Sequence, residues 1–525
     1  MLNQFFLLKI HARRFLALCT LATVLIALGG WLWRPALWLC VPLGVVLAIG
    51  LADLLQTHNS IVRNFPVLGH LRYQLRDIAP ELHQYFVEND TDGKPFDKTQ
   101  RDLVDKRAEL ENDTHPFGTE REIGAVDYEW VPHSIYPKPA LEQHPRITIG
   151  GRACTQPYAA AIFNISAMSY GSLSAAAVRA LNKGASLGGF FHDTGEGGLT
   201  PYHLEFGADL AWEIGSGYFG CRTPDGRFDP EAFAEKARLP QVKLIEIKLS
   251  QGAKPGHGGV LPAAKNTPEI ARIRGVEPYT KVVSPAYHRE FADAPGLLGF
   301  VQRLRELSGG KPVGFKLCVG KLDELRDVCR AMHATGIRPD FITVDGSEGG
   351  TGAAPIEFSD SVGMPLERGL VALTDHLDGF DLRDEIRVLA SGKVISGFDI
   401  VRCLALGADA CNSARGMMFA LGCIQALKCD TNECPTGITT HDPALTRGLV
   451  VADKARRVAN FQRETVRAAL ELLAAMGLDD LDALGREHIL KRISPHVIRS
   501  FAELYPPVRR GSYLTAVDRP LAAVW

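Results

Sequence analysis

Short apolar runs that alternate with helical patterns dominate the chain from about residue 159 onward. The runs, where we expect strands, cover residues 160–166, 190–194, 244–249, 281–284, 313–318, 341–344, 387–390 and 410–413. Amphipathic patterns typical of helices lie between most of them, at residues 174–187, 297–307, 322–333 and 398–406. This alternation predicts an α/β protein, a (β/α)8 TIM barrel. A doubly wound open sheet is the main alternative, but no Gly-x-Gly-x-x-Gly follows the first run.

Two uncharged stretches, residues 15–33 and 35–52, precede this region. Each nearly spans a hydrocarbon core of roughly 30 Å at the helical rise of about 1.5 Å per residue. Trp31, Trp33 and Trp38 lie near the junction, where amphipathic rings favour the membrane interface. The pattern predicts a membrane anchor at residues 1–53, one hairpin of two transmembrane helices. A cleaved signal peptide is the alternative.

The charges before the first stretch predict the orientation of this anchor. Lys9, Arg13 and Arg14 precede it, so the positive-inside rule places the N-terminus in the cytoplasm. Two crossings then return the catalytic domain to the cytoplasmic face of the inner membrane.

The remaining segments flank the expected barrel, residues 156–443. Residues 54–155 are polar and Pro-rich, which predicts a linker or wrapping extension. Residues 444–525 are expected to form a helical C-terminal extension, with an apolar face through Val466, Ala469, Leu470 and Leu473 and a break at Ile493-Ser494-Pro495. The charge balance, 58 basic against 60 acidic residues, offers no footprint for nucleic acid.

Glycine and polar residues crowd the loops that would follow the strands. Four such loops lie at residues 168–174, 194–198, 251–259 and 345–352. In a barrel the chemistry gathers in these loops, and glycine lets the backbone approach a flat or phosphorylated ligand. Tight turns alone would explain one loop, but four in register indicate a ligand.

Two further features of the strands and their loops indicate charged ligands. The loops after the last two strands, at residues 391–393 and 414–416, are the usual phosphate site of this barrel, and the second opens a helix whose amides would favour an anion. Lys248 and Lys316 lie in apolar strands, where a lysine is costly unless it faces a partner charge or a ligand. The alternative is a lysine that extends to solvent.

Three of the eleven cysteines are clustered, in the pattern Cys423-x5-Cys429-x4-Cys434-Pro. Soft thiolates at this spacing suit an iron–sulfur cluster, whereas zinc takes four ligands with shorter spacings. Three ligands would give a [3Fe–4S] cluster, or a [4Fe–4S] cluster with an outside ligand. Buried free thiols are the alternative.

Taken in order, the loops and the cysteine run resemble the FMN-binding synthase domain of glutamate synthase, here in a membrane-anchored, stand-alone form. The resemblance covers about residues 155–450. It implies FMN over the barrel mouth, a [3Fe–4S] cluster beside it, and reductive amination of 2-oxoglutarate by ammonia to L-glutamate. It also implies an electron donor, a ferredoxin or a reductase subunit.

The resemblance assigns a role to each matching residue. Ser169, Gly171 and Lys316 would lie at the flavin, and Ser391, Gly392, Arg415 and Gly416 would hold its phosphate. Lys248, Gln251, Lys254 and Arg274 would bind the 2-oxoacid, Lys254 also acting in catalysis with Glu196 as acid/base. Cys423, Cys429 and Cys434 would ligate iron.

The chain also departs from the family pattern. His257 stands where the family carries Glu, and Ser347-Glu348 replaces His-Asp. No stretch resembles the family's glutaminase or an NADPH-binding domain. Two alternatives therefore stay open: a related synthase that uses another amine, of the N-methylglutamate type, and a membrane-tethered flavin/iron–sulfur electron carrier without amination.

Overall fold

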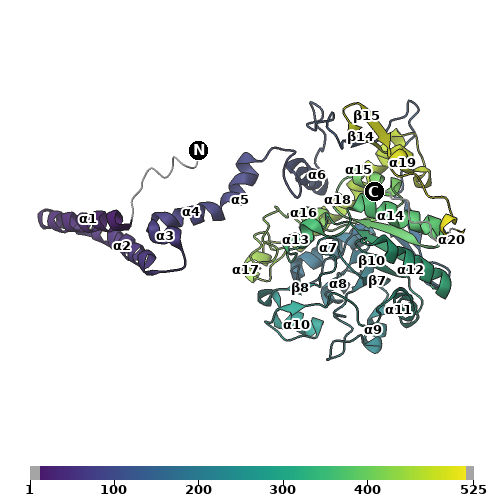
Figure 1. Ribbon diagram of the computed structural model, residues 1–525, viewed down its shortest axis with the longest axis horizontal. Coiled ribbons are helices and arrows are strands. Elements are labelled where there is room, and N and C mark those ends of the chain that lie inside the picture. The colour runs from purple at the N-terminus through teal and green to yellow at the C-terminus, as the bar shows by residue number, and fades with distance from the viewer. Residues whose placement is uncertain (1–11, 516–525) are drawn as a thin grey trace. The chain divides into compact units, whose positions relative to one another are not determined.

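The structure is a computed structural model that describes residues 12–515, in two compact units, Met1–Pro95 and Phe96–Trp525. Each unit is described by itself. Figure 1 shows the helices of the first unit and the barrel of the second.

The first unit begins with two apolar helices, α1 (Ala12–Leu32) and α2 (Cys40–Leu55), joined by the 3-10 turn η1 (Arg34–Leu39). Within the described residues, one helical stretch, Leu37–Leu55, is long and apolar enough to cross a membrane, and the apolar stretch Ala17–Leu32 is shorter. Two spans were predicted, and by length and composition together one stretch qualifies among the described residues. Lys9, used to predict the orientation, lies outside the described residues.

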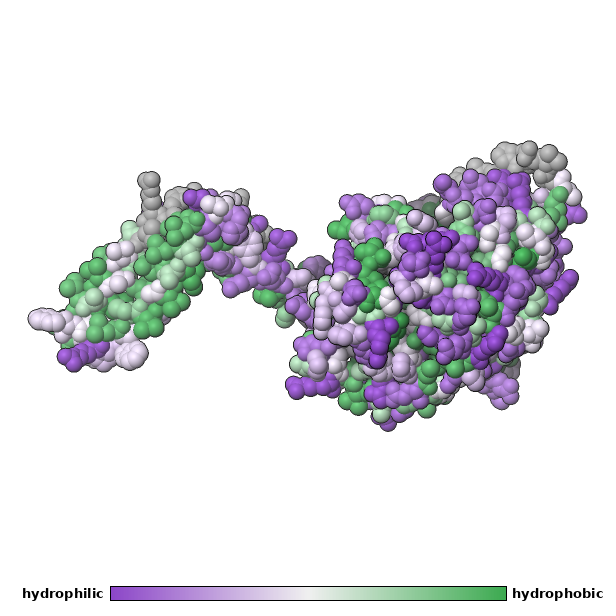
Figure 2. Space-filling view, turned by 90° about the horizontal axis from the view of Figure 1, so that it is seen from below, coloured by the Kyte–Doolittle hydropathy of each residue, from purple (hydrophilic) through white to green (hydrophobic). Residues whose placement is uncertain are grey.

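Apolar side chains cover the outside of these two helices (Figure 2). Only 11% of the Leu37–Leu55 stretch is buried, and Trp38 is 78% exposed. Asp53 near the end of α2 accepts hydrogen bonds from the Val67 amide and from His70 Nε2, at 2.8 and 2.7 Å. The rest of the unit is helical: α3 (Ser60–Asn64), α4 (Leu68–Asp77), α5 (Ala79–Leu82) and the π-helical turn η2 (His83–Val87).

The second unit is built on a closed parallel barrel, as predicted. Within the described residues its strands, in chain and barrel order, are β4 (Phe163–Ile165), β5 (His192–Asp193), β6 (Leu210–Ile214), β7 (Val242–Lys248), β10 (Val313–Leu317), β11 (Phe341–Asp345), β12 (Arg387–Ser391) and β13 (Ala410–Ser413). The connecting helices are α7 (Ala175–Gly188), α8 (Pro201–Leu204), α9 (Pro230–Ala237), α11 (Ala294–Leu307), α12 (Leu322–Thr335), α14 (Leu366–Gly379) and α15 (Gly397–Ala405).

One barrel strand was missed by the prediction, and one predicted strand lies outside the barrel. Strand β6 was missed, because Glu213 interrupts its apolar pattern; this side chain faces the barrel interior, where it pairs with Lys316. Residues 281–284 are not a barrel strand: β9 (Val282–Val283) pairs antiparallel with β8 (Val260–Leu261). This ribbon, with η3 (Ala263–Lys265) and α10 (Pro268–Arg274), is an insertion between β7 and α11.

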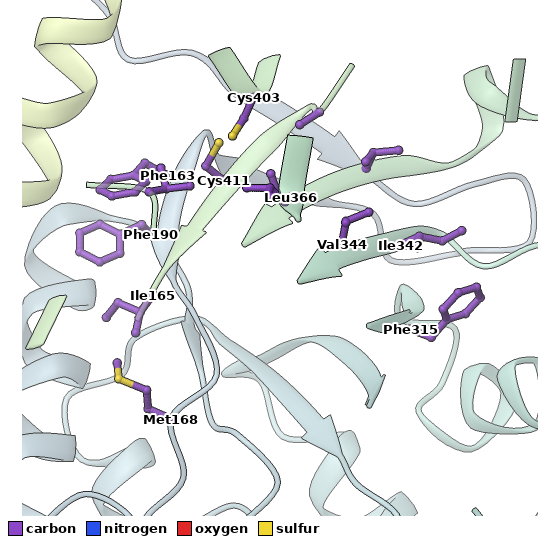
Figure 3. Close-up of a cluster of buried hydrophobic side chains, with 14 of the residues drawn as sticks. Phe163, Ile165, Met168, Phe190, Phe315, Ile342, Val344, Leu366, Cys403 and Cys411 are labelled. Carbon is purple, nitrogen blue, oxygen red and sulfur yellow. The ribbon is translucent and has the colours of Figure 1, made fainter. Parts of the chain in front are cut away.

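Side chains alternate between the two faces of each strand, as parallel strands require. Outward residues such as Phe163, Ile342 and Cys411 pack in the main core beneath the helices (Figure 3). Inward residues at the N-terminal end, among them Leu244, Phe341 and Leu389, form a separate apolar plug. Above the plug the inward residues are polar.

The remaining elements surround the barrel. The hairpin of β2 (Arg146–Ile149) and β3 (Tyr158–Ala161) contributes to the plug. Helix α18 (Val451–Ala475) buries Val466, Ala469, Leu470 and Leu473, as predicted, and packs against α6 (Lys98–Glu109), α7 and α15. The short helices are α13 (Ile356–Ser361), α16 (Arg415–Ala420), α17 (Pro443–Thr446), α19 (Phe501–Leu504) and α20 (Ser512–Thr515), and the 3-10 turns are η4 (Arg383–Glu385), η5 (Leu481–Ala483) and η6 (Arg486–His488).

The C-terminal extension is helical over α18, as predicted, and the structure adds a short β-sheet after it. Strands β14 (Leu490–Ser494) and β15 (Val497–Ser500) form an antiparallel hairpin, and β14 also pairs with β1 (Glu129–Trp130). The break expected at Ile493-Ser494-Pro495 therefore falls at a hairpin turn, which proline favours.

Candidate active site

The barrel mouth, where the strands end at their carboxyl ends, holds an ion pair between Glu196 and Lys248. Glu196 lies in the loop after β5, and Lys248 is the last residue of β7. Lys248 Nζ is 3.0 Å from Glu196 Oε1 and 2.5 Å from Gln251 Oε1. Both charged side chains are at most 16% exposed. Three residues predicted to act on substrate are thus in direct contact.

Glycine is required beside Glu196 because the backbone closes on its carboxylate. A Cβ at Gly259 would lie 2.2 Å from Glu196 Oε1, and one at Gly215 would lie 2.8 Å from Glu196 Cβ. Any larger residue at either position would displace the carboxylate.

Two more buried cations, Lys254 and Arg274, act on the same carboxylate. Lys254 Nζ donates to the Gly258 carbonyl at 2.8 Å. Arg274, at the end of α10, donates to the Tyr170 carbonyl at 3.0 Å and lies over the ring of Phe219. Lys254 and Arg274 are 2% and 5% exposed. We call Lys248, Lys254 and Arg274, together with Glu196, the cation pocket.

The pKa values of the cation pocket reflect this crowding. Burial on its own raises the pKa of Glu196, but Lys248, Arg274 and Lys254 outweigh it and hold the pKa below its usual value. Burial lowers the pKa of Lys254 to about 8 and that of Arg274 to about 10. With the two lysines and the arginine protonated, the pocket has three positive charges against one negative charge. This surplus of two suits a ligand with two carboxylates.

A second charged cluster lies inside the barrel, around Lys316. Its ammonium contacts Glu213 and lies 3.8 Å from Glu246 Oε2. Oxygens of Asp193, Glu213 and Glu246 lie within 4.8 Å of one another, and Thr343 donates a hydrogen bond to Glu246. We call the three carboxylates and Lys316 the carboxylate layer.

Charge is reversed in the carboxylate layer, with three carboxylates against one cation. Burial and the neighbouring carboxylates raise the pKa of Asp193, and burial raises that of Glu246 to about 7. Burial opposes the charge on Lys316, but Glu213, Glu246 and Asp193 outweigh it and raise its pKa. Lys316 therefore stays protonated, and protons on the carboxylates neutralise the remaining charge. Lys316 was expected from the sequence to be buried; its carboxylate partners were not identified.

The residues predicted at the phosphate lie at the ends of β12 and β13. Ser391 Oγ is 3.1 Å from Ser166 Oγ. Arg415 donates to the Glu348 carbonyl at 2.6 Å, and its guanidinium lies 4.8 Å from the ring centroid of Phe96. Lys393 approaches the same ring at 5.5 Å. Phe96 comes from the region interpreted as a linker, and no pattern in the sequence marks it.

Two of the predicted phosphate-site glycines pack closely against other segments. Gly416 is buried in α16, a helix of six residues, where a Cβ would meet Ser413 Oγ at 2.5 Å. At Gly392, at the end of β12, a Cβ would lie 3.4 Å from the Gly346 amide nitrogen. Asn412 Oδ1, on the inward face of β13, is buried without a hydrogen-bond partner among the described residues.

The glycine-rich loops also pack against one another. A Cβ at Gly252 would lie 1.7 Å from the Gly346 carbonyl oxygen. A Cβ at Gly195 would lie 2.6 Å from the Ser169 amide nitrogen. Loop packing therefore accounts for part of the glycine content that the sequence analysis attributed to a ligand.

The three clustered cysteines lie in the segment between α16 and α17, and all are free thiols. The Gln425 amide donates to Cys423 Sγ at 3.4 Å, and Cys434 Sγ lies 3.3 Å from Thr436 Oγ1. The three thiols lie close enough to act on one another: burial, together with Cys429 and Cys434, raises the pKa of Cys423 to about 11.

Comparison with known proteins shows to which family the chain belongs. A family model described as "conserved region in glutamate synthase" matches residues 97–479. The chain belongs to the glutamate synthase family. Its members are oxidoreductases, which agrees with the resemblance found in the sequence.

Individual relatives support the same assignment. The chain is 38% identical over 495 residues to the "glutamate synthase large subunit-like protein YerD" of Bacillus subtilis (strain 168), covering 86% of this chain and 94% of the relative. It is 33% identical to an "archaeal-type glutamate synthase (NADPH)" of Thermotoga neapolitana and 35% identical to an "archaeal glutamate synthase (NADPH)" of Methanocaldococcus jannaschii. These two matches cover 63% and 61% of this chain, and 62% and 60% of the relatives' own length.

Proposed function

We propose that the chain is a glutamate synthase-type oxidoreductase of the class acting on CH–NH2 donors, which converts 2-oxoglutarate and ammonia into L-glutamate. The observation that carries the proposal is the cation pocket, with its surplus of two positive charges at the barrel mouth. 2-Oxoglutarate is a dianion of matching charge. An electron carrier has no use for such a pocket, so its presence favours synthesis over electron transfer alone.

In the proposed reaction ammonia condenses with the 2-oxo carbon, water leaves, and 2-iminoglutarate accepts a hydride and a proton. Lys248, Lys254, Gln251 and Arg274 bind the two carboxylates and keep the imine carbon electrophilic. Glu196, with its pKa held low by the three cations, accepts a proton from the incoming amine and returns one to the nitrogen. The loops that pack around Glu196 exclude water from this step.

The mouth also suits FMN, which when bound and reduced would supply the hydride. Ser169 and Gly171 are proposed to contact the flavin and Lys316 to lie at its pyrimidine edge. Ser391, Gly392, Arg415 and Gly416 are proposed to hold the phosphate. Two features support the fit: Asn412 Oδ1, which is buried without a hydrogen-bond partner in the described part of the chain, and the half-buried Arg415 and Lys393 cations beside Phe96.

We further propose that Cys423, Cys429 and Cys434 ligate a [3Fe–4S] cluster that accepts electrons from a ferredoxin or a reductase subunit. The mutual influence of the three thiols on the pKa of Cys423 supports a shared ligand. We propose that the apolar stretches Ala17–Leu32 and Leu37–Leu55 together form the hairpin that anchors the protein in the inner membrane. Two crossings, with the N-terminus in the cytoplasm, place the barrel on the cytoplasmic side.

The proposal is tested first on anaerobically purified, detergent-solubilised protein. We expect about one FMN and three irons per chain, with flavin absorption over a broad iron–sulfur shoulder. The dithionite-reduced protein is then mixed with 2-oxoglutarate and ammonium in stopped flow. Reoxidation of the flavin with formation of one L-glutamate per flavin supports the proposal.

A variant and a second amine serve as controls for this test. A Glu196→Gln variant is expected to bind flavin normally but to slow reoxidation at least 100-fold. Methylamine replaces ammonium in a parallel run, and preferential use of methylamine would favour an N-methylglutamate-type synthase. Reoxidation only by an electron acceptor would contradict synthesis and favour the carrier.

A further inference from the structure

Lys265 is a buried lysine that lies between two segments. One is the loop after β4, where Ser169 and Gly171 are proposed to contact the flavin, and we call it the flavin loop. The other carries the three clustered cysteines, and we call it the cysteine segment. Lys265 ends the turn η3 in the insertion after β7 and is 1% exposed. Its Nζ donates to the Ser172 carbonyl and to the Cys429 carbonyl, each at 2.9 Å. Ser172 belongs to the loop after β4, and Cys429 is one of the three clustered cysteines. One ammonium thus joins three segments that are far apart in the sequence.

Other contacts hold the same two segments together. His441 Nε2 lies 2.9 Å from the Gly171 carbonyl oxygen. The Ser174 amide donates to the Ile438 carbonyl, and Ser174 Oγ donates to the Gly437 carbonyl, both at 2.8 Å. These bonds join backbone, hydroxyl and imidazole groups, whereas Lys265 contributes an ammonium group that bonds to both segments.

Groups of the cysteine segment attract the charge of Lys265. Burying an ammonium is costly unless opposite charge lies close by. Here Asp430 supplies such charge, and Cys429 and Cys434 add to it when they are thiolates. Lys311 provides a contrast: its Nζ donates to the Ala237 and Leu239 carbonyls, at 2.6 and 2.7 Å, with no thiol beside it.

We propose that Lys265 is a positioning residue for electron transfer, which holds the cysteine segment against the flavin loop and stabilises negative charge on the thiolates. The proposal rests on the proposed function, because it requires the cysteines to bind a cluster. A cation beside the thiolates favours the reduced, more negative state of the cluster and raises its reduction potential. It also fixes the distance over which electrons pass to the flavin.

The test compares three variants of the full-length protein, Lys265→Met, Lys265→Arg and Lys311→Met. Lys265→Met keeps the length and removes the charge, Lys265→Arg keeps the charge, and Lys311→Met removes a buried lysine of similar hydrogen bonding remote from the cysteines. Iron and FMN per chain, the midpoint potential of the cluster from an anaerobic titration followed by electron paramagnetic resonance, and thermal unfolding are measured for each.

We expect Lys265→Met to lower the midpoint potential of the cluster and to slow its electron exchange with the flavin at least 10-fold, while FMN content stays at the wild-type level. Lys265→Arg should restore the potential. Lys311→Met should lower the unfolding temperature without moving the potential. If Lys265→Met fails to fold, Lys265→Gln takes its place: a lowered potential supports the proposal, and a potential equal to that of wild type contradicts it.

Two results would overturn the proposal, and they are distinguishable. A wild-type protein with FMN but without iron would remove the proposed cluster and this inference with it. A wild-type cluster whose potential and electron exchange are unchanged in Lys265→Met would overturn the inference alone and leave the proposed function standing.

Discussion

The cation pocket and the carboxylate layer have opposite charge balances within one barrel. Three cations surround Glu196 at the mouth, and three carboxylates surround Lys316 in the interior. Both clusters are buried, but they are neutralised differently. The carboxylate layer takes up protons, as the raised pKa values of Asp193 and Glu246 show. The guanidinium of the cation pocket does not titrate near neutral pH, so the pocket keeps positive charge for an anionic ligand.

The comparison shows that positive charge is in excess at the mouth of the barrel and that carboxylates are in excess in its interior. The single lysine of the interior layer is held in place by its carboxylate neighbours. The mouth keeps a surplus of positive charge, which suits an anionic ligand. Four predictions follow from this difference, in order of decreasing effect.

Removing the one cation of the carboxylate layer should have the largest effect. Lys316→Met leaves three buried carboxylates without a counter-charge, and we expect a loss of about 3–5 kcal/mol in the free energy of unfolding. Chemical denaturation followed by tryptophan fluorescence measures it. Lys321→Met is the control, because Lys321 pairs with Glu324 on the surface at 75% exposure and should change stability by less than about 1 kcal/mol. Equal losses in both variants would refute the structural role of the layer.

Removing one cation from the mouth should weaken substrate binding and lower stability less than the loss of Lys316, because Arg274 and Lys254 still act on Glu196. A hydrogen bond to a charged group contributes about 1.5–3 kcal/mol, so Lys248→Met should raise KM for 2-oxoglutarate about 10- to 100-fold. Lys243→Met is the matched control on the same strand, since Lys243 pairs with Asp209 at 3.7 Å, near the opposite end of the strand. An unchanged KM in Lys248→Met would show that the substrate binds elsewhere.

The pH dependence of substrate binding should follow Lys254. Burial lowers its pKa to about 8, so its charge is present below that pH and is lost as the pH rises through it. We expect KM for 2-oxoglutarate to rise above about pH 8 by up to 10-fold per pH unit. Lys254→Arg keeps its charge and should remove this rise. A profile that is identical in wild type and Lys254→Arg would assign the titration to another group.

The last effect, on the pH dependence of stability, is spread over the widest pH range and amounts to at most about 1.4 kcal/mol per pH unit. The pKa of Glu246 rises from a usual value of 4.5 to about 7 on folding, so between these values the folded state binds more protons than the unfolded state. The contribution of Glu246 to stability is therefore lost as the pH rises from about 4.5 to 7. Glu246→Gln should flatten this part of the profile in a denaturation series. A slope equal to that of wild type would show that Glu246 is not the titrating group.

The sequence was most informative where local spacing carries the chemistry. The cysteine run and the glycine-rich loops stand out by their spacing, and Lys248 and Lys316 stand out as cations in apolar strands. The partners could not be found the same way. Glu213 concealed strand β6, because a carboxylate that faces a buried lysine resembles a surface residue in a linear pattern. Phe96 and Lys265 reach the site from segments with no periodicity of their own.

Affinity for a dianion tests the central claim most directly. Isothermal titration of the oxidised, detergent-solubilised protein compares 2-oxoglutarate with 2-oxobutyrate, which has the same 2-oxo group but one carboxylate. We predict that 2-oxoglutarate binds at least about 10-fold more tightly, and that Lys254→Met removes most of this difference. Equal affinity for the two acids in the wild-type protein would contradict the account, because the surplus charge at the mouth would then serve another purpose.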